Sequence, residues 1–274
     1  MTPTTIDDPA DPRIETFRDI RERDIVGRGG FIAEGAVVLD QLLDSQRFRP
    51  TALMVLENRL AGLLPRLARL PDDIPVYVAS RSVFDAIAGF PVHRGILAHA
   101  EAVIPTGGAG DEAVNLARLA AQKATVVVAA GIANHDNMGA IFRNAAAFGA
   151  GAVLVDDASC DPLYRKAIRV SVGSVLTVPF ARAGRAEAIH ADLQSAGFRC
   201  LALSPKGQVA LHELQCEGPA ALFLGAEGPG LPQSIMDEME TLRIAMAPGL
   251  DSLNVATSAA LVLHHLYSAA SSGR

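Results

Sequence analysis

Three short segments in the second half of the chain carry the side chains best suited to bind or activate a ligand. The first places Asn134, His135, Asp136 and Asn137 ahead of a helical pattern that Arg143 interrupts. Asn and Asp are common helix caps, so part of this group has a structural explanation. Arg143 stands in an otherwise apolar helix and must be either buried and paired or facing a pocket. A guanidinium offers a rigid fork of donors that suits phosphate or carboxylate.

The second segment, residues 225–230, is the glycine-rich run Gly-Ala-Glu-Gly-Pro-Gly after the apolar stretch 220–224. Glycine lets the backbone adopt positive φ and approach a ligand closely. The run does not match GxGxxG, and no GK[ST] follows it, which disfavours the common dinucleotide-binding and P-loop sites.

The third segment places Ser252 and Asn254 on either side of Leu253, just before a long apolar helix that begins at Val255. Both polar residues are good N-cap types. A structural cap needs only one of them, so the other is a candidate ligand contact.

Hydrophobic periodicity shows which elements hold these segments. Helices are predicted over 116–122, 138–148, 162–172, 186–196 and 255–270, and strands over 125–130, 152–155, 175–178, 200–203, 220–224 and 242–246. Strands that alternate with helices indicate an α/β fold with a parallel, doubly wound sheet. Such sheets bind ligands beyond the carboxyl ends of their strands, where all three segments begin. We therefore expect Arg143, Glu227 and Asn254 to converge.

The remainder of the chain divides at the glycine-rich residues 107–111. Residues 1–19 are predicted to be a disordered tail, because the start is acidic and rich in Thr and Pro. Residues 20–104 alternate between strand-like and helical patterns and predict a small α/β domain. A linker over 105–114 then leads to the second domain, 115–274.

Composition narrows the classes of partner. The 274 residues carry a formal net charge of -6, which argues against a general polyanion-binding surface. A nucleic-acid partner would need a local basic patch, and the candidate side chains are Arg143, Arg165, Lys166, Arg169, Arg182 and Arg185. The alternative for these residues is an ordinary solvated helix face.

Targeting and metal signals are weak in this sequence. No apolar run reaches the roughly 18 residues that cross a bilayer, and the N-terminus lacks the features of a secretion signal. Cys160, Cys200 and Cys216 form no CxxC pair, so neither a zinc site nor a disulfide framework is expected. Free thiols fit a reducing cytoplasm, which is the predicted location.

Taken together, the three segments resemble the motifs of a known family. The pattern N-x-x-N-x-G-x-x-x-R-x-A-x-x-x-G is matched by Asn134, Asn137, Gly139, Arg143, Ala145 and Gly149. The second motif is matched by Gly225, Glu227, Gly228 and Gly230, and the third by Met246, Ser252, Leu253, Asn254 and Val255. In order and spacing these resemble the SpoU/TrmH family of RNA 2'-O-ribose methyltransferases, in the SPOUT superfamily, over about 125–270. Small departures are His135 and Ala245, where many relatives carry Pro.

The resemblance implies a fold and a cofactor. The second domain would be a parallel-sheet SPOUT domain with a deep trefoil knot, an exception to the usual absence of threaded chains. The first would be a small L30e-like RNA-binding domain, on the weaker match of residues 31–35 and 93–98. The family uses S-adenosylmethionine, and the implied binding residues are Leu224, Gly225, Glu227, Gly230, Ile244, Met246 and Leu253. Family members are usually homodimers through the C-terminal domain, and helix 255–266 either supplies that interface or is buried within one subunit.

The resemblance also implies a reaction, methyl transfer from S-adenosylmethionine to a ribose 2'-OH of structured RNA, with the two-domain layout favouring ribosomal RNA. The implied catalytic residues are Arg143, Asn137, Glu227, Ser252 and Asn254, and Arg165, Lys166 and Arg169 are candidate RNA contacts. Because arginine stays protonated in proteins, we expect Arg143 to clamp a phosphate and stabilise the developing alkoxide. The alternatives are a transfer-RNA substrate, a non-catalytic RNA-binding protein with a vestigial donor pocket, and a nucleotide-binding oxidoreductase.

Overall fold

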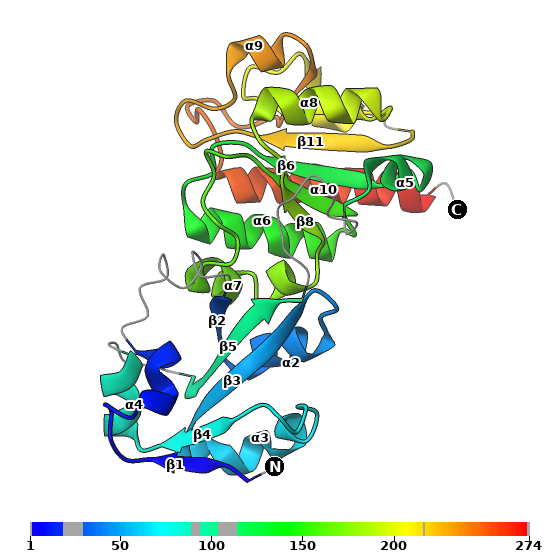
Figure 1. Ribbon diagram of the computed structural model, residues 1–274. Coiled ribbons are helices and arrows are strands. Elements are labelled where there is room, and N and C mark those ends of the chain that lie inside the picture. The colour runs from blue at the N-terminus through cyan, green and yellow to red at the C-terminus, as the bar shows by residue number, and fades with distance from the viewer. Residues whose placement is uncertain (1, 19–29, 89–93, 104–113, 216, 273–274) are drawn as a thin grey trace. The chain divides into compact units, whose positions relative to one another are not determined.

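The computed structural model describes residues 2–18, 30–88, 94–103, 114–215 and 217–272. The chain divides into two compact units (Figure 1). Unit 1 comprises Met1–Ile104 and Leu163–Thr177, and unit 2 comprises Pro105–Pro162 and Val178–Arg274. Residues 105–113 of the predicted linker and Cys216 lie outside the described residues.

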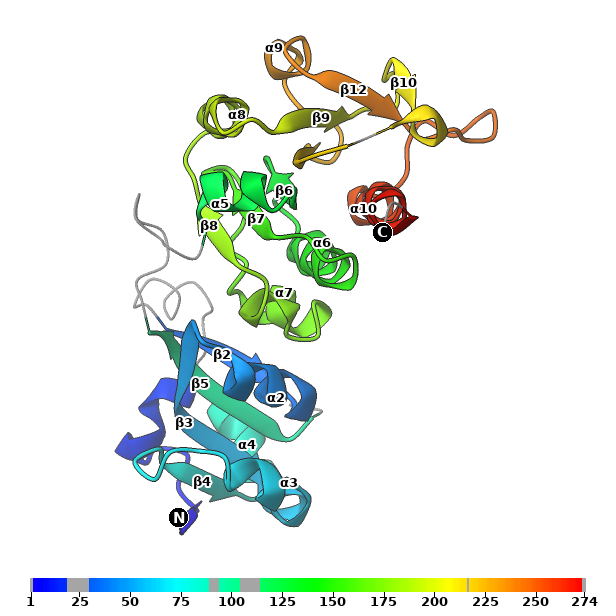
Figure 2. The ribbon, with the colours of Figure 1, turned by 90° about the vertical axis from the view of Figure 1, so that its right-hand side faces the viewer.

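Unit 1 is built on a mixed five-stranded sheet in the order β1-β4-β3-β5-β2 (Figure 2). Its strands are β1 (Thr4–Ile6), β2 (Gly30–Glu34), β3 (Phe48–Leu56), β4 (Val76–Ala79) and β5 (Ile96–Ala102). The helices between them are α2 (Ala36–Asp44), α3 (Leu60–Leu67) and α4 (Arg81–Ala88), with a short 3-10 turn η2 (Glu57–Arg59). β3 runs parallel to β4 and antiparallel to β5, and β5 pairs antiparallel with β2. The predicted α/β domain is therefore present in its elements.

The prediction of a disordered tail is wrong for the described part of residues 1–19. β1 adds to the sheet in parallel beside β4, and a 3-10 segment, η1 (Pro12–Phe17), follows it. Ile6, Ile14 and Phe17 are buried with at most 1% of their surface exposed. Three apolar side chains scattered among acidic and Pro residues have no readable period, so only the tertiary contacts reveal the strand.

A second difference concerns residues 163–177, which belong to unit 1 although they lie between two strands of unit 2. They form α7 (Arg165–Val170) and a 3-10 turn, η3 (Ser174–Leu176), where a strand over 175–178 was predicted. The strand prediction is wrong because Gly173 turns the chain at a φ of 88° and Ser171 Oγ accepts from the Val175 amide at 3.4 Å. Val175 and Leu176 are fully buried, as their apolar character requires.

Side-chain contacts tie this segment into unit 1. Arg165 Nη1 lies 2.8 Å from Glu34 Oε2, and the Glu34 side chain on β2 is only 4% exposed. The Ser45 hydroxyl, just after α2, donates to the Leu176 carbonyl at 2.9 Å. A buried carboxylate is stable only when it is paired and hydrogen-bonded, so the buried Glu34 depends on its ion pair with Arg165.

Unit 2 is built on a seven-stranded parallel sheet in the order β10-β12-β9-β11-β6-β7-β8, as predicted from the alternating pattern. Its strands are β6 (Thr125–Ala129), β7 (Ala152–Val155), β8 (Phe180–Arg182), β9 (Arg199–Leu203), β10 (Val209–Ala210), β11 (Ala220–Leu224) and β12 (Glu240–Arg243). Its helices are α5 (Leu116–Ala121), α6 (His135–Ala147), α8 (Ala186–Ser195), α9 (Gln233–Met236) and α10 (Val255–Ser272), with a 3-10 turn η4 (Leu211–Glu213). The short β10 and α9 were not predicted.

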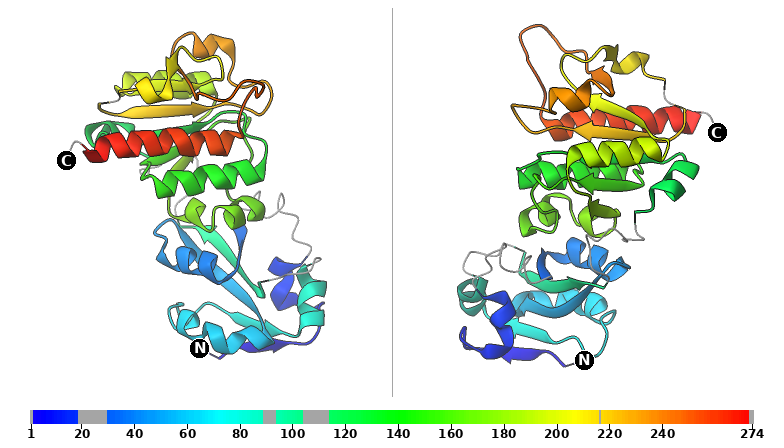
Figure 3. Two further views of the ribbon diagram at one scale, coloured as in Figure 1. Left: turned by 180° about the vertical axis from the view of Figure 1, so that it is seen from behind. Right: turned by 45° about the horizontal axis from the view of Figure 1, so that its top comes forward.

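Helices cover both faces of this sheet (Figure 3). Leu119 of α5, Ile189 of α8 and Ile235 of α9 join one apolar cluster with alternate residues of the strands, including Val126 and Phe223. On the other face α6 and α10 lie side by side, joined where Asn144 Nδ2 donates to the Ala256 carbonyl at 2.7 Å. Within the described ranges, no helix is long and apolar enough to cross a membrane.

The strand register brings the predicted segments to one edge of the sheet. Leu224 at the end of β11 pairs with Ala129 at the end of β6, and Ala129 pairs with Val155 at the end of β7. On the other side, Leu203 of β9 pairs with Leu242 of β12. All three segments therefore leave the sheet at the same carboxyl edge.

The ion pair between Arg165 and Glu34 gives the first prediction. Arg165→Ala should destabilise the protein by about 3–5 kcal/mol, because it leaves a buried carboxylate without its partner. Replacing both residues, as Glu34→Leu with Arg165→Met, should recover most of the loss. Urea denaturation checks this, with Arg13→Ala as the control because the Arg13 side chain, paired with Asp11, is 52% exposed. Equal losses of stability in Arg165→Ala and Arg13→Ala would contradict the prediction.

Candidate functional site

The first segment is organised by a helix cap. Asn134 Oδ1 accepts from the Asp136 amide at 2.8 Å and from the Asn137 amide at 3.4 Å, and α6 begins at His135. The capping role considered for this segment therefore belongs to Asn134. This leaves the Asn137 side chain available for other partners.

Asn137 joins the three segments through its side-chain amide. Its Nδ2 donates to Glu227 Oε1 in the second segment, and its Oδ1 accepts from Asn254 Nδ2 in the third at 2.8 Å. Only 6% of Asn137 is exposed. Asn254 Oδ1 also caps α10, accepting from the Ala256 and Thr257 amides at 3.0 and 3.2 Å. The predicted convergence is confirmed for Glu227 and Asn254, with Asn137 between them.

The glycines of the second segment allow a tight turn. The Gly230 amide donates to the Ala226 carbonyl at 2.9 Å, and Gly228 and Gly230 have φ values of 89° and 71°. A Cβ on Gly225 would lie 2.4 Å from the Leu231 nitrogen and 2.5 Å from the Gly230 carbonyl carbon. Any other residue at 225 would clash with backbone, so glycine is needed here to close the turn.

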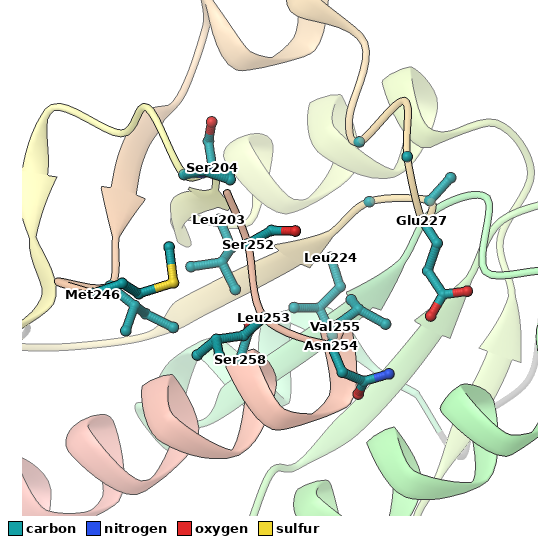
Figure 4. Close-up of a pocket in the computed structure, with 16 residues that line it drawn as sticks. Leu203, Ser204, Leu224, Glu227, Met246, Ser252, Leu253, Asn254, Val255 and Ser258 are labelled. Carbon is teal, nitrogen blue, oxygen red and sulfur yellow. The ribbon is translucent and has the colours of Figure 1, made fainter. Parts of the chain in front are cut away.

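A pocket of about 470 Å³ opens between the second and third segments (Figure 4). It is lined by Leu203, Ser204, Pro205, Leu224, Gly225, Ala226, Glu227, Gly228, Gly230, Ile244, Met246, Ser252, Leu253, Asn254, Val255 and Ser258. All seven residues predicted to bind a donor are among them, as are Ser252 and Asn254. Their role in binding stays a prediction, because the lining shows only where they lie.

The loop after β9 was missed from the sequence. Leu203, Ser204 and Pro205 line the pocket, and Ser258 adds a hydroxyl from the first turn of α10. The available signal was positional, since β9 ends at the same sheet edge as β11 and β12. The residues themselves carry no motif that would single them out.

The pocket is polar at one end and largely apolar at the other. Figure 4 shows the Glu227 carboxylate and Asn254 amide on one side and Met246 on the opposite side. Leu203, Leu224 and Ile244 add apolar surface. An apolar pocket with a few placed polar groups is typical of small-molecule and cofactor sites. The residues present fit an adenosine-like ligand, because small and apolar segments can enclose a flat ring.

Within the described part of the chain, Arg143 is neither buried nor paired, and it does not line the pocket described above. Its side chain is exposed on α6, it does not line the pocket, and it has no hydrogen bond or ion pair within the described residues. It follows Asn137 by six positions, which places it roughly 240° around the helix and about 9 Å along the axis. The alternative that it is buried and paired is wrong, and the predicted convergence of Arg143 with Glu227 and Asn254 is not seen within one chain.

The predicted basic patch is divided between the two units. Arg165, Lys166 and Arg169 belong to unit 1 and the other three residues to unit 2. Arg165 is engaged by the buried Glu34, and Arg182 Nη1 donates to the Asp156 and Ser159 carbonyls at 2.7 and 3.3 Å. Lys166 is exposed and Arg169 is half-buried, so RNA contact by these two stays a prediction.

The described residues contain no cluster of three His, Cys, Asp or Glu side chains that could hold a metal ion. Cys160 and Cys200 are free thiols, and burial raises the pKa of each to about 11. A thiol with such a pKa is not a ready nucleophile near neutral pH.

Known proteins resemble the chain both in sequence and in fold. The model of the SpoU rRNA methylase family matches residues 124–264. An uncharacterised tRNA/rRNA methyltransferase of Mycobacterium tuberculosis is 40% identical over 268 residues, covering 94% of this chain and 89% of the relative.

Solved structures show the same fold along nearly the whole chain. An RNA 2'-O ribose methyltransferase is 25% identical, with a TM-score of 0.78 over 98% of this chain and 99% of the other. An AdoMet-bound rRNA methyltransferase from Sinorhizobium meliloti is 22% identical, with a TM-score of 0.79 over 96% of each chain. The family match and the sequence identity agree with the motifs that Asn137 holds together, and the chain belongs to the SpoU rRNA methylase family.

Proposed function

We propose that the protein transfers a methyl group from S-adenosylmethionine to a ribose 2'-OH of RNA. The observation that carries this proposal is the Asn137 amide, which joins all three motifs at the edge of a pocket of about 470 Å³. Family membership supports RNA methylation in general, and the 2'-O position is supported by the similarity to a solved RNA 2'-O ribose methyltransferase.

The pocket is proposed to hold the methyl donor mainly through backbone and apolar surface. Gly225, Gly228 and Gly230 have no side chain that would keep a ligand away from the main chain, while Leu224, Ile244 and Leu253 supply apolar contacts. The Sinorhizobium meliloti enzyme was crystallised with AdoMet, which supports this ligand class. Bound there, S-adenosylmethionine supplies an electrophilic methyl carbon on a sulfonium, which departs as a neutral thioether.

The protein's own residues are proposed to prepare the ribose hydroxyl. The 2'-oxygen forms its bond to carbon as it gives up its proton, so negative charge develops on it. Placed donors and positive charge stabilise such developing charge. Arg143 is exposed and therefore open to an RNA chain, and its fork of donors suits a phosphate beside the reacting ribose. The bridge from Asn137 to Glu227 and Asn254 orients the polar end of the pocket.

The RNA class is proposed to be ribosomal, with transfer RNA as the alternative. The described part of unit 1 is an α/β unit with a five-stranded sheet, as an L30e-like domain would be, and a domain of that kind would bind structured RNA. The mycobacterial relative's name includes both RNA classes. Mapping 2'-O-methyl sites in RNA from cells without the protein would decide between them.

A trefoil knot is also part of the proposal. The chain passes from β12 through residues 244–254, several of which line the pocket together with residues 203–205 and most of 225–230, before α10 packs on α6. The support for a knot is membership of the SpoU rRNA methylase family, which implies this fold. A cytoplasmic location stays a prediction.

The activity is tested by transfer of a labelled methyl group to RNA, with the product nucleoside identified as ribose-methylated. Arg143→Ala should lower this rate by about 10²–10³-fold, the range seen when one transition-state donor is removed. Its affinity for S-adenosylmethionine in calorimetry should be unchanged, because Arg143 lies outside the pocket. NAD serves as the control ligand and should not bind. Full methylation by Arg143→Ala would remove the proposed role.

Exchanging the donor and the acceptor between residues 137 and 227 tests whether their hydrogen bond organises the site. Asn137→Asp places two carboxylates together and should weaken S-adenosylmethionine binding by about tenfold or more, a cost of roughly 1–3 kcal/mol. Adding Glu227→Gln restores a donor on the opposite side, so the double variant should regain most of the affinity. Calorimetry with the single and double variants checks this. If the double variant instead loses as much affinity as the two single variants together, the hydrogen bond between residues 137 and 227 is not what holds the segments together.

We propose a homodimer formed through α10. Ala259, Val262 and Leu263 are buried within one chain, while Leu261 and Tyr267 keep 43% and 51% of their surface exposed. Sedimentation should give twice the mass of one chain, and replacing both exposed residues by Lys should give the monomer. Leu64→Lys is the matched control, because Leu64 is 55% exposed in unit 1. A wild-type monomer at micromolar concentration would contradict the proposal.

A further inference from the structure

A second cavity, of about 500 Å³, lies at the same edge of the unit 2 sheet. Residues after β6, β7 and β8 line it, together with the turn after β11: Ala130, Gly131, Asp156, Asp157, Ala158, Arg185, Ala186, Glu187, Ala226, Pro229, Gly230, Leu231 and Pro232. Ala226 and Gly230 also line the first pocket. The glycine-rich turn is therefore a wall common to both cavities.

Most of the charged groups in this second cavity are already hydrogen-bonded or ion-paired to other groups of the protein. Asp156 is 7% exposed, and its Oδ1 accepts from the Gly131 amide at 3.0 Å, the Ser159 amide at 2.9 Å and the Ser159 hydroxyl at 2.6 Å. That carboxylate holds the loop after β6 to the loop after β7. It has a structural role and is not offered to a ligand.

Arg185 and Glu187 pair with each other at the rim. Arg185 Nε lies 3.4 Å from Glu187 Oε2, and the two side chains are 81% and 49% exposed. The pKa of Glu187 is lowered by its own backbone amide first and then by Arg185. The two opposite charges largely offset each other.

Asp157 is the carboxylate that remains for a ligand. It is exposed, its amide donates to the Gly184 carbonyl at 3.0 Å, and its carboxylate has no partner within the described residues. Small and apolar residues surround it, among them Ala158, Ala186 and Pro229. A carboxylate would repel a phosphate, so the cavity favours a ligand that brings N–H donors on a flat apolar body.

A nucleobase has this chemistry. Proteins read unstacked bases by stacking against apolar side chains and by hydrogen bonds to the Watson–Crick edge. Guanine presents two adjacent donors on that edge, N1–H and the 2-amino group, and these match the two oxygens of one carboxylate. Cytosine and adenine present one amino donor, and uracil presents only its N3–H.

We propose that this second cavity binds a guanine base of the RNA substrate, with Asp157 accepting from its Watson–Crick edge. The inference rests on the proposed RNA methyltransferase function and names a specificity element for it. Because the two cavities have a common wall, a guanine held here lies in the strand near the nucleotide presented to the first pocket. The site therefore selects RNA sequences with a guanine near the methylated position.

Ligand-observed NMR with GMP, CMP, AMP and UMP tests the site directly in the full-length protein. GMP should bind most tightly and UMP most weakly. Asp157→Asn should weaken GMP by about tenfold or more, as for a bidentate base contact. Ala158→Phe, which fills the cavity without removing a hydrogen bond, should also weaken it. Asp192→Asn is the matched control, because Asp192 is an exposed carboxylate on α8 that lines neither cavity.

The outcomes separate this inference from the proposed function. S-adenosylmethionine affinity in Asp157→Asn should equal that of the wild type, which shows that the first pocket is intact. Equal binding of GMP and UMP, or no effect of Asp157→Asn on GMP, would overturn the guanine site even if RNA is methylated. Binding of tetralysine through Asp157 without binding of GMP would also overturn it, in favour of a basic protein partner. If the protein prefers GMP but methylates no RNA, the guanine site is supported and the proposed function is wrong.

Discussion

The buried side-chain amide of Asn137 is the interaction on which the site depends. It donates to Glu227 and accepts from Asn254, so one planar group satisfies partners from two other loops. An amide is suited to this because it carries a donor and an acceptor on the same carbon atom. Aspartate would lack the donor, and leucine would leave Glu227 and Asn254 without their partner. The parallel sheet brings the loops to one edge, and the amide fixes their spacing.

Much of unit 2 could be predicted from the sequence because its signals are local. Apolar runs such as 125–129 and 220–224 identify buried parallel strands without knowledge of their neighbours. Once the strands are parallel, the polar and glycine-rich residues that follow them must share an edge. The motif resemblance then identified seven residues, from Leu224 to Leu253, that the structure places around one pocket.

The failures came from residues whose state is set by distant partners. β1 is a strand because Thr4–Ile6 pairs with residues 77–79, which no local pattern indicates. Arg165 and Arg143 look alike in sequence, each a basic residue in a helix. Glu34, 131 residues away, binds Arg165, whereas Arg143 is exposed. Residue type identifies a possible role, and only the tertiary environment distinguishes an ion-paired arginine from one open to a ligand.

The turn after β11 forms part of the wall of both cavities. Ala226 and Gly230 line both cavities, and the Gly225 backbone is packed so closely that no Cβ fits there. The two residues that line both cavities, Ala226 and Gly230, have no long side chain to separate them. The turn is held by the bridge between Ala226 and Gly230 and by the hydrogen bond from Asn137 to Glu227. Closure of the turn therefore explains the glycine at 225, and the small residues Ala226 and Gly230, which line both cavities, keep the cavities adjacent.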